Sequence, residues 1–253
     1  MSILTEIIET KKQEVNRLKQ TLDPKKQRTV PLVSFLDQFQ TQPFQVIAEF
    51  KRASPSKGII NDTLDPVTQA KTYEQYGAGM ISVLTDQPYF KGSIDDLIAV
   101  KQAVNIPVLN KEFIIDPVQL DLAYQAGADV VLLIVSALTD EALKALYHYA
   151  TKLGLEVLVE VHDQEELNTA LALGCPLIGI NNRNLKTFTT SINQTLDLMQ
   201  TIDLNGVHII SESGMKEAED VLTVKRAGAS GVLVGETLMT HDPKQMIGAF
   251  LNE

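Results

Sequence analysis

The feature that most constrains the fold of this chain is a set of eight short apolar runs that recur at regular intervals. Most are rich in Val, Ile and Leu, and they occupy residues 46–50, 80–84, 107–110, 129–135, 156–160, 176–181, 207–211 and 231–235. Runs that are apolar almost throughout are typical of parallel strands covered on both faces. Because parallel neighbours need long crossover connections, we expect a helix between each pair of strands. The mean spacing of about 26 residues fits one strand and one helix per unit.

The segments between the runs carry helical periodicity and helix start signals. They cover residues 66–77, 94–104, 116–126, 139–152, 164–173 and 215–227. Asp163 and Glu166 have the spacing of a capping box at the start of one of these helices. Turns from helix to strand repeat a glycine signature that suits a left-handed helix stop, in Gly77-Ala-Gly, Gly127-Ala-Asp, Gly174-Cys-Pro and Gly228-Ala-Ser.

These units predict an α/β fold, a (β/α)8 TIM barrel, formed as a single domain by residues 1–253. A doubly wound open sheet is the competing architecture, but eight regularly spaced units without a linker favour closure. Residues 1–45 lie outside the repeat and are expected to form an N-terminal helical extension packed on the barrel. Its apolar positions are Leu4, Ile7, Ile8, Val15 and Leu18 in one helical stripe, and Phe35 and Phe39 in a second. The extension either only caps the barrel or also forms part of a substrate pocket.

Charge and composition limit the partners and the compartment. The formal net charge of −10 argues against nucleic acid or an acidic membrane surface as a partner, because both are anionic. No obligate protein partner is evident, and an anionic substrate would need a local cationic pocket. The single cysteine, Cys175, excludes an intrachain disulfide and favours a reducing compartment. The acidic N-terminus does not resemble a signal peptide, and no apolar run approaches the ~18 residues of a membrane span. We therefore expect a cytoplasmic protein.

Polar side chains follow several of the strands at the end where barrel enzymes carry their catalytic groups. Glu49 and Lys51 end the first strand and share one face as i and i+2. Other strands end in Lys111, in Glu160, in Asn181, Asn182 and Arg183, and in Ser211, Glu212 and Ser213. A single charged residue here would most simply belong to a solvated ion pair worth ~0–1 kcal/mol. Two lysines and three glutamates on one rim instead favour acid–base catalysis, and such clustering can tune a lysine toward neutral pH.

The last two strands end in glycines that suit a phosphate site. Ser213-Gly214 precedes one helix, and Gly235-Glu236-Thr237 precedes a short apolar segment. Glycines let backbone N–H groups approach a phosphate, and a helix N-terminus adds partial positive charge. The alternative is that they only form tight turns.

Other patterns point away from metals and nucleotides. The four histidines, His148, His162, His208 and His241, lack metal-ligand spacing, and His208 is expected as a core histidine within a strand. Cys175 lies before the sixth strand, on the wrong side of the barrel for a nucleophile. No dinucleotide or P-loop pattern is present. We therefore expect neither a metal nor another cofactor.

A set of motifs gives the chain a specific resemblance. The motifs are Glu49-Phe-Lys-Arg-Ala-Ser-Pro-Ser-Lys-Gly58, Leu109-Asn-Lys-Glu-Phe113, Leu158-Val-Glu-Val-His162, Ile180-Asn-Asn-Arg-Asn-Leu185, Ser211-Glu-Ser-Gly214 and Val234-Gly-Glu-Thr-Leu238. In this order they resemble the indole-3-glycerol-phosphate synthase family, and the resemblance covers essentially the whole chain. It implies decarboxylation and ring closure of 1-(2-carboxyphenylamino)-1-deoxyribulose 5-phosphate to indole-3-glycerol phosphate, CO2 and water in tryptophan biosynthesis, without a cofactor.

The resemblance also implies roles for the rim residues. Lys51 would hold the substrate carboxylate or donate a proton, and Lys111 would protonate the ribulose carbonyl oxygen. Glu160 and Glu49 would move protons during ring closure and dehydration, and Asn181 would position a substrate hydroxyl or Lys111. The residues expected to bind substrate and phosphate are Ser54, Arg183, Glu212, Ser213, Gly214, Gly235 and Glu236, with Phe90 and Phe113 on the aromatic ring. The chain departs from some relatives in Ala53, where they carry a lysine, and in Asn184, where an aspartate is common.

Three other readings remain open. A barrel lyase could form a Schiff base through Lys111 or Lys51. The isomerase that precedes this step also uses such a barrel, but it relies on a cysteine and an aspartate where this chain has Glu49, Lys51 and Lys111. A non-catalytic binding module is the third reading.

Overall fold

A computed structural model describes residues 2–184, 187–201 and 205–252 of the chain. Leu185, the last residue of one of the motifs, lies outside the described residues.

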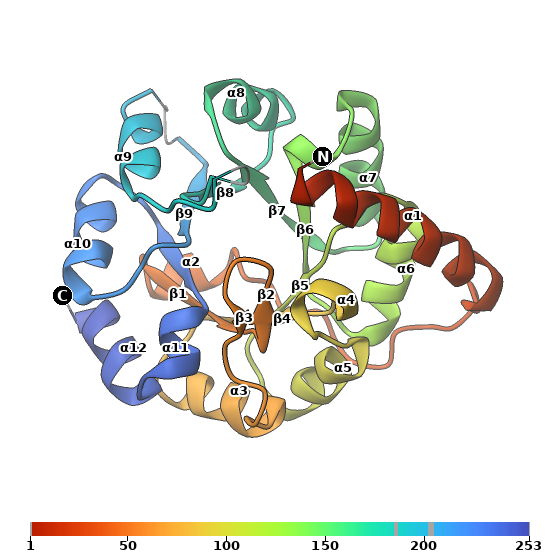
Figure 1. Cartoon of the computed structure of the whole chain (residues 1–253), viewed down its shortest axis with the longest axis horizontal. Helices are drawn as coiled ribbons and strands as arrows, with labels where there is room; N and C mark the ends of the chain where they lie inside the picture. The colour runs from red at the N-terminus through yellow and green to blue at the C-terminus, as the bar shows by residue number, and fades with distance from the viewer. Residues whose placement is uncertain (1, 185–186, 202–204, 253) are drawn as a thin grey trace.

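Eight parallel strands close into a barrel, which confirms the TIM-barrel prediction over the open sheet (Figure 1). The strands are β1 (Gln45–Phe50), β4 (Met80–Leu84), β5 (Val108–Lys111), β6 (Val130–Ile134), β7 (Glu156–Val161), β8 (Leu177–Asn181), β9 (His208–Glu212) and β10 (Gly231–Val234). Strand β1 pairs with β4 on one side and with β10 on the other, and this second pairing closes the ring. Two further short strands, β2 (Ala53–Ser54) and β3 (Gly58–Ile59), form an antiparallel hairpin after β1.

Helices surround the barrel (Figure 1). They are α1 (Ile3–Thr21), α2 (Gln38–Thr41), α3 (Pro66–Gln75), α4 (Gln87–Phe90), α5 (Ile94–Ala103), α6 (Pro117–Ala126), α7 (Asp140–Lys152), α8 (Gln164–Ala172), α9 (Asn193–Met199), α10 (Ala218–Arg226), α11 (Glu236–Thr240) and α12 (Pro243–Asn252), with the short 3₁₀ helix η1 (Val135–Ala137) after β6. All six helices predicted between the strands are present, and their ends lie within three residues of the predicted positions. The prediction omitted α9, α12 and the short helices α4 and α11.

Local capping explains where several helices begin. Asp65 and Asp116 accept backbone N–H groups at the starts of α3 and α6, and in each case proline follows directly. Asp163 also caps a helix, because its side chain accepts from the Glu166 N–H at the start of α8. The expected capping box is wrong, however, because the returning contact from Glu166 is not formed. The Glu166 carboxylate accepts from the backbone and ring of His162 instead of returning to Asp163.

Two apolar layers result from the period-two alternation along the strands. One set of side chains fills the barrel interior, including Ile47, Leu109 and Leu158. The alternate set, such as Val46 and Ala48 of β1, packs outward against the helices. Residues two positions beyond an inward core residue therefore also point inward at the strand end.

The N-terminal extension covers two places on the barrel. Phe35 is fully buried among the interior side chains at the amino ends of the strands. Phe39 stacks on His208 with ring centroids 3.9 Å apart. The expectation of a core histidine is wrong here, because His208 is the first residue of β9 and lies half-buried at the barrel floor. Helix α1 instead reaches the opposite end of the barrel, where Ile7 contributes to a cavity. The extension therefore caps one end of the barrel and also lines a cavity at the other.

A buried lysine anchors α1 to that end of the barrel. Lys11 is only 1% exposed, and its Nζ lies 2.7 Å from Asp86, 3.0 Å from Glu112 and 2.8 Å from Glu14. Asp86 follows β4 and Glu112 follows β5, so one ammonium group links α1 to two loops. Burial alone would lower the pKa of Lys11, but the surrounding carboxylates raise it above its ordinary value.

No helix among the described residues is long and apolar enough to cross a membrane.

Candidate active site

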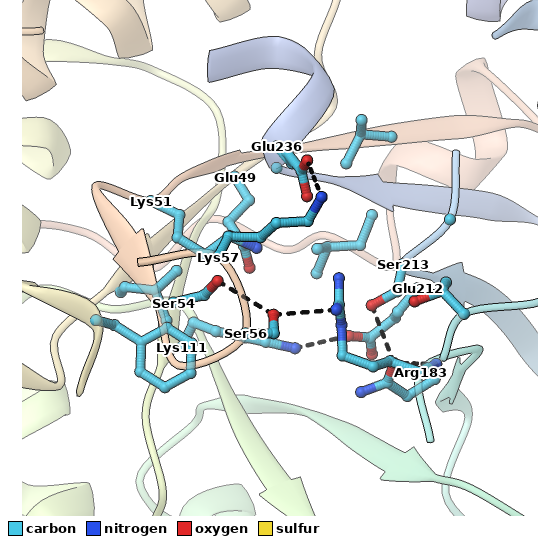
Figure 2. A pocket seen from close by; sticks show the side chains of 18 of the residues that line it. Glu49, Lys51, Ser54, Ser56, Lys57, Lys111, Arg183, Glu212, Ser213 and Glu236 are labelled. Atoms are coloured by element: carbon cyan, nitrogen blue, oxygen red, sulfur yellow. Dashed lines mark hydrogen bonds and ion pairs between the residues drawn. The ribbon is translucent and has the colours of Figure 1, made fainter. Parts of the chain in front are cut away.

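A cavity of about 610 Å³ opens at the carboxyl ends of the strands. Its polar lining comes from several strand ends and the loops that follow them, and includes Glu49, Lys51, Lys111, Glu160, Asn181 and Glu212. Every residue predicted for the site lines this cavity: these six together with Ser54, Phe90, Phe113, Arg183, Ser213, Gly214, Gly235 and Glu236. The structure therefore brings the whole predicted set together. Figure 2 labels eight of its polar members: Glu49, Lys51, Ser54, Lys111, Arg183, Glu212, Ser213 and Glu236.

Strand alternation explains why the charged groups point into the cavity. Lys111 follows Leu109 by two positions, and Glu160 follows Leu158 in the same way. Glu212 also points inward, and it needs space that the neighbouring strand provides. A Cβ atom at Gly179 of β8 would lie 2.0 Å from Glu212 Oε1, so only glycine leaves room for this carboxylate.

Lys111 lies between two buried carboxylates. Its Nζ is 2.6 Å from Glu212 Oε2 (Figure 2) and 3.0 Å from Glu160 Oε2. Burial alone would lower the pKa of Lys111, but Glu212, Glu160 and then Glu49 raise it above its ordinary value. The expectation that the cluster tunes a lysine toward neutral pH is therefore wrong for Lys111. In the free site this side chain is a charged donor held by two acceptors.

The group tuned toward neutral pH is Glu212. Burial, with the nearby charges of Glu160 and Glu49, raises the pKa of this carboxyl group to about 7 against the opposing effect of Lys111. Its Oε1 atom is buried without a hydrogen-bond partner within the described residues. The sequence placed Glu212 among the substrate-binding groups, whereas its direct contact here is with Lys111.

Glu160 is held from three directions. Besides Lys111 on Oε2, its Oε1 atom accepts a 3.0 Å hydrogen bond from Asn181 Nδ2 and lies 3.2 Å from His162 Nε2. Burial would raise the pKa of Glu160, but Lys111 and His162 lower it well below its usual range. Asn181 thus contacts Glu160 and not Lys111, and its Oδ1 accepts from Ser213 Oγ at 3.0 Å.

A second lysine and glutamate form a separate pair on β1. Lys51 Nζ lies 2.6 Å from Glu49 Oε1, and the lysine side chain is 18% exposed toward the cavity. Gly235 lies directly beside them, because a Cβ atom there would fall 2.4 Å from Glu49 Oε1 and 3.0 Å from Lys51 Nζ. The pair is therefore next to the loop that follows β10.

The loops after β9 and β10 form a concave stretch of backbone. Ser213 and Gly214 have consecutive positive φ angles of 65° and 92°, a conformation that turns successive N–H groups to one side. Gly235 precedes α11 without a side-chain cap, so the first N–H groups of that helix have no side-chain acceptor from the capping position. Both features suit an anion. Lys57 contacts Glu236 at 3.1 Å across this region (Figure 2).

The β2–β3 hairpin lies over the mouth of the barrel (Figure 1) and is held from the opposite side. Arg183, after β8, donates from Nη1 to Ser56 Oγ at 3.1 Å, and Ser56 lies 3.4 Å from Ser54 Oγ. Figure 2 shows this chain of contacts between Arg183 and the hairpin. Ser54 and Arg183, predicted to bind substrate, are therefore connected before any ligand binds.

One wall of the cavity is apolar. Phe90 and Phe113 approach with ring centroids 5.8 Å apart. Ile3, Leu4 and Ile7 of α1 extend this wall. A flat aromatic group would fit between these side chains and the charged floor.

Several residues that line the cavity were not predicted from the sequence as site residues. They include Ile3, Ser56, Lys57, Phe188, Thr190, Lys216 and His241. His162, which contacts Glu160 without lining the cavity, and Lys11, which anchors α1, were missed as well. His162 follows β7 directly and lies two positions beyond Glu160, so its spacing from Glu160 could have identified it. Nothing in the sequence pattern singles out Lys11 from its lysine neighbours.

Across residues 2–184, 187–201 and 205–252, no three His, Cys, Asp or Glu side chains gather as ligands for a metal ion. The rim carboxylates pair with lysines instead.

Comparison with known proteins gives a consistent family. The model of the family "Indole-3-glycerol phosphate synthase" matches residues 4–250. A protein of that name from Bacillus cereus strain B4264 is 54% identical over 241 residues, which are 94% of this chain and 93% of the relative. The relative from Bacillus mycoides strain KBAB4 is 53% identical with the same coverage.

Among solved structures, an N-acetylmannosamine-6-phosphate 2-epimerase from Clostridium perfringens superposes with a TM-score of 0.60. It is 15% identical, and the match covers 79% of this chain and 89% of the epimerase. At that identity the similarity concerns the fold alone.

Proposed function

The chain belongs to the indole-3-glycerol phosphate synthase family, and from this premise we propose how its rim residues divide the work of the family's reaction. That reaction is the ring closure of 1-(2-carboxyphenylamino)-1-deoxyribulose 5-phosphate to indole-3-glycerol phosphate, with release of CO2 and water. The whole chain acts as one barrel domain in this proposal, with residues 1–45 as the extension that completes the pocket.

The substrate has three parts that match three regions of the cavity. The phosphate binds at the backbone of Ser213, Gly214, Gly235 and Glu236, where N–H groups and a helix start favour an anion. The aromatic ring packs against Phe90 and Phe113. The carboxylate lies near Lys51, whose single ion-pair partner among the described residues is Glu49. Arg183 and Ser54 then contact the ribulose chain from the hairpin side.

Lys111 acts as the general acid of ring closure. It donates a proton to the ribulose carbonyl oxygen while the ring carbon that bears the carboxylate attacks the carbonyl carbon. Loss of CO2 returns the bonding electrons to the ring, and the hydroxyl group formed from the carbonyl then leaves as water. Lys111 regains its proton from water, which the negative charge of the Glu160 carboxylate favours. In the dehydration, Glu49 accepts the proton removed from the carbon next to the nitrogen, and Lys51 donates a proton to the departing hydroxyl group and regains one from Glu49. Asn181 keeps Glu160 in place.

The observation that carries this proposal is the position of Lys111 Nζ, 2.6 Å and 3.0 Å from two buried carboxylates and inside a cavity with one apolar wall. A positioned proton donor of this kind contributes about 100- to 10,000-fold in rate. The test is to mix the purified protein with the substrate, without metal or cofactor, and to follow indole fluorescence and CO2 release together. We expect both with the native protein and neither with Glu160→Gln. A folded native protein that gives no indole contradicts the proposal.

A Schiff-base lyase on the same rim is the alternative for Lys111. Its two carboxylate contacts favour the protonated form, which is not a nucleophile. Borohydride treatment in the presence of substrate separates the two mechanisms, since only an imine is trapped as a stable adduct on the protein. We expect no adduct.

We also propose that the protein works in the cytoplasm on this small phosphorylated substrate, without nucleic acid, a membrane or an obligate protein partner. The single cysteine and the net charge of −10 support this placement.

A further inference from the structure

His162 contacts two carboxylates through its two ring nitrogens. Nδ1 lies 3.0 Å from Glu166 Oε2, and Nε2 lies 3.2 Å from Glu160 Oε1. His162 Nε2 and Glu160 Oε1 are close enough for an ion pair, but their geometry is not that of a hydrogen bond. A neutral imidazole carries one N–H, so one of its nitrogens would turn a lone pair toward a carboxylate oxygen. Only the doubly protonated ring offers a donor to each acceptor.

The surroundings of His162 contain acceptors and no competing cation in direct contact among the described residues. From η1, Ser136 Oγ lies 3.5 Å from Nδ1, and from α9, Gln194 donates to the His162 carbonyl oxygen at 2.7 Å. Glu166 of α8 also accepts from the His162 backbone N–H at 2.9 Å. On the far side of Glu160, Lys111 of β5 binds the opposite oxygen of the same carboxylate.

The ring is held in this position from outside the cavity. His162 is 14% exposed and does not line the cavity, whereas Glu160 does. Burial would lower the pKa of His162, but the contacts with Glu160 and Glu166 raise it to about 10. Glu160 therefore has one positive partner inside the cavity, Lys111, and a second behind it.

We propose that His162 is a positioning residue of the reaction: held by Glu166 as an imidazolium, it supplies a second positive charge to Glu160 and keeps that carboxylate ionised when Lys111 gives up its proton. This inference rests on the proposed function. When Lys111 becomes neutral, Glu160 would otherwise keep only the Asn181 hydrogen bond as direct compensation. With His162 behind it, Glu160 remains a carboxylate whose negative charge favours the return of a proton from water to Lys111.

The charge on His162 can be measured without turnover. The chain has four histidines, so a ¹⁵N spectrum of the imidazole nitrogens contains few signals, and the signals missing in His162→Gln identify this ring. We expect the imidazolium pattern at pH 8, where an unperturbed histidine is neutral. A neutral ring at pH 8 overturns the proposal whether or not the protein makes indole.

Kinetics then test what the charge does. In His162→Gln an N–H donor remains near Glu160, but the positive charge is lost. We expect kcat at pH 7 to fall about tenfold, which is the rate change that corresponds to a shift of one unit in the pKa of the Glu160 carboxylate. The acid limb of the kcat profile should move to higher pH, with KM within about twofold. The matched control is His148→Gln on the exposed face of α7, which should leave the profile unchanged.

Glu166→Gln gives a second variant that keeps the ring. Removing this negative charge lowers the pKa of His162. Activity should therefore match that of the native enzyme at low pH, and it should fall toward that of His162→Gln at a lower pH than in the native protein. A purely structural role for His162 would not produce this shift. An active native enzyme with unchanged profiles in both variants overturns the inference, whereas an inactive native enzyme overturns the proposed function instead.

Discussion

Replacing Lys111 by Met removes the ammonium group from between Glu160 and Glu212 and keeps a chain of similar length. Among the described residues, Lys111 makes no hydrogen bond or ion pair with Lys51 or with the backbone expected to bind the phosphate. The variant should therefore lose turnover while keeping most of its affinity for the substrate. We expect kcat to fall by about 100- to 10,000-fold, the range for a positioned general acid.

The size of this effect corresponds to about 2.7 to 5.5 kcal/mol of barrier, at about 1.4 kcal/mol for each tenfold change. The same substitution also affects the fold, because breaking a buried ion pair leaves an uncompensated charge at a cost of about 3–5 kcal/mol. Glu212 reduces that cost when it is protonated. Since the pKa of Glu212 is about 7 in the native site, Lys111→Met should lose less unfolding free energy at pH 6 than at pH 8.

The assay compares kcat from indole fluorescence with binding of a substrate analogue in which the carbonyl group is reduced to an alcohol. Lys144→Met, on the exposed face of α7, is the matched control and should change neither quantity. An analogue affinity within about threefold of the native value, with kcat reduced at least 100-fold, supports the acid role. Equal losses in kcat and in affinity refute it and move the acid role to Lys51.

Three further substitutions test other parts of the account. Lys11→Met leaves Asp86 and Glu112 without their shared cation, so urea unfolding should show a loss of about 3–5 kcal/mol in the free energy of unfolding. The control is Lys12→Met, where the lysine is 57% exposed and the loss should be about 0–1 kcal/mol. Similar losses for the two variants would contradict the anchoring role of Lys11. Gly179→Ala places a Cβ atom 2.0 Å from Glu212 Oε1, so kcat should fall at least about tenfold. The control Gly248→Ala, with nothing within 4 Å of its Cβ atom, should retain full activity. An active Gly179→Ala enzyme would show that Glu212 can occupy another position. Glu212→Gln tests the carboxyl group whose pKa of about 7 in the native protein exceeds its value of about 4.3 in the unfolded chain. Between these two pH values the native protein binds more protons than the unfolded chain. Glu212 therefore favours folding below pH 4, and this contribution is lost as the pH rises to 7. The native protein should therefore lose more unfolding free energy than Glu212→Gln between pH 5 and pH 8, and parallel curves from urea unfolding at each pH would refute the assigned shift.

The barrel could be predicted because its signal is repeated along the chain. Eight apolar runs and six intervening helices each give a separate indication of one fold, and errors at single ends do not accumulate. The predicted strand ends differ from the observed ones by one residue at most. The capping box at Asp163 failed for a tertiary reason, since Glu166 contacts His162 at the end of β7 rather than its own helix start.

The site could be predicted only as a set of positions. Strand alternation and the resemblance placed Lys111, Glu160 and Glu212 on one rim, but which carboxylate binds which lysine depends on distances across the barrel. Glu212 was expected at the substrate and lies against Lys111, because Gly179 on the neighbouring strand leaves space for it. The pKa of Lys111 was misjudged for the same reason, since two carboxylates outweigh burial.

In the proposed function, one cavity binds both ends of the substrate. The phosphate binds at the backbone of the loops after β9 and β10, and the aromatic ring packs on the wall formed by Phe90, Phe113 and α1. A crystal structure with indole-3-glycerol phosphate bound tests this most directly. We expect the phosphate within hydrogen-bond distance of the Gly214 and Glu236 N–H groups, the indole ring packed against Phe90 and Phe113, and Lys111 near the carbon that carried the hydroxyl group. A product bound with its phosphate at Lys51, or with its ring away from both phenylalanines, would contradict the account.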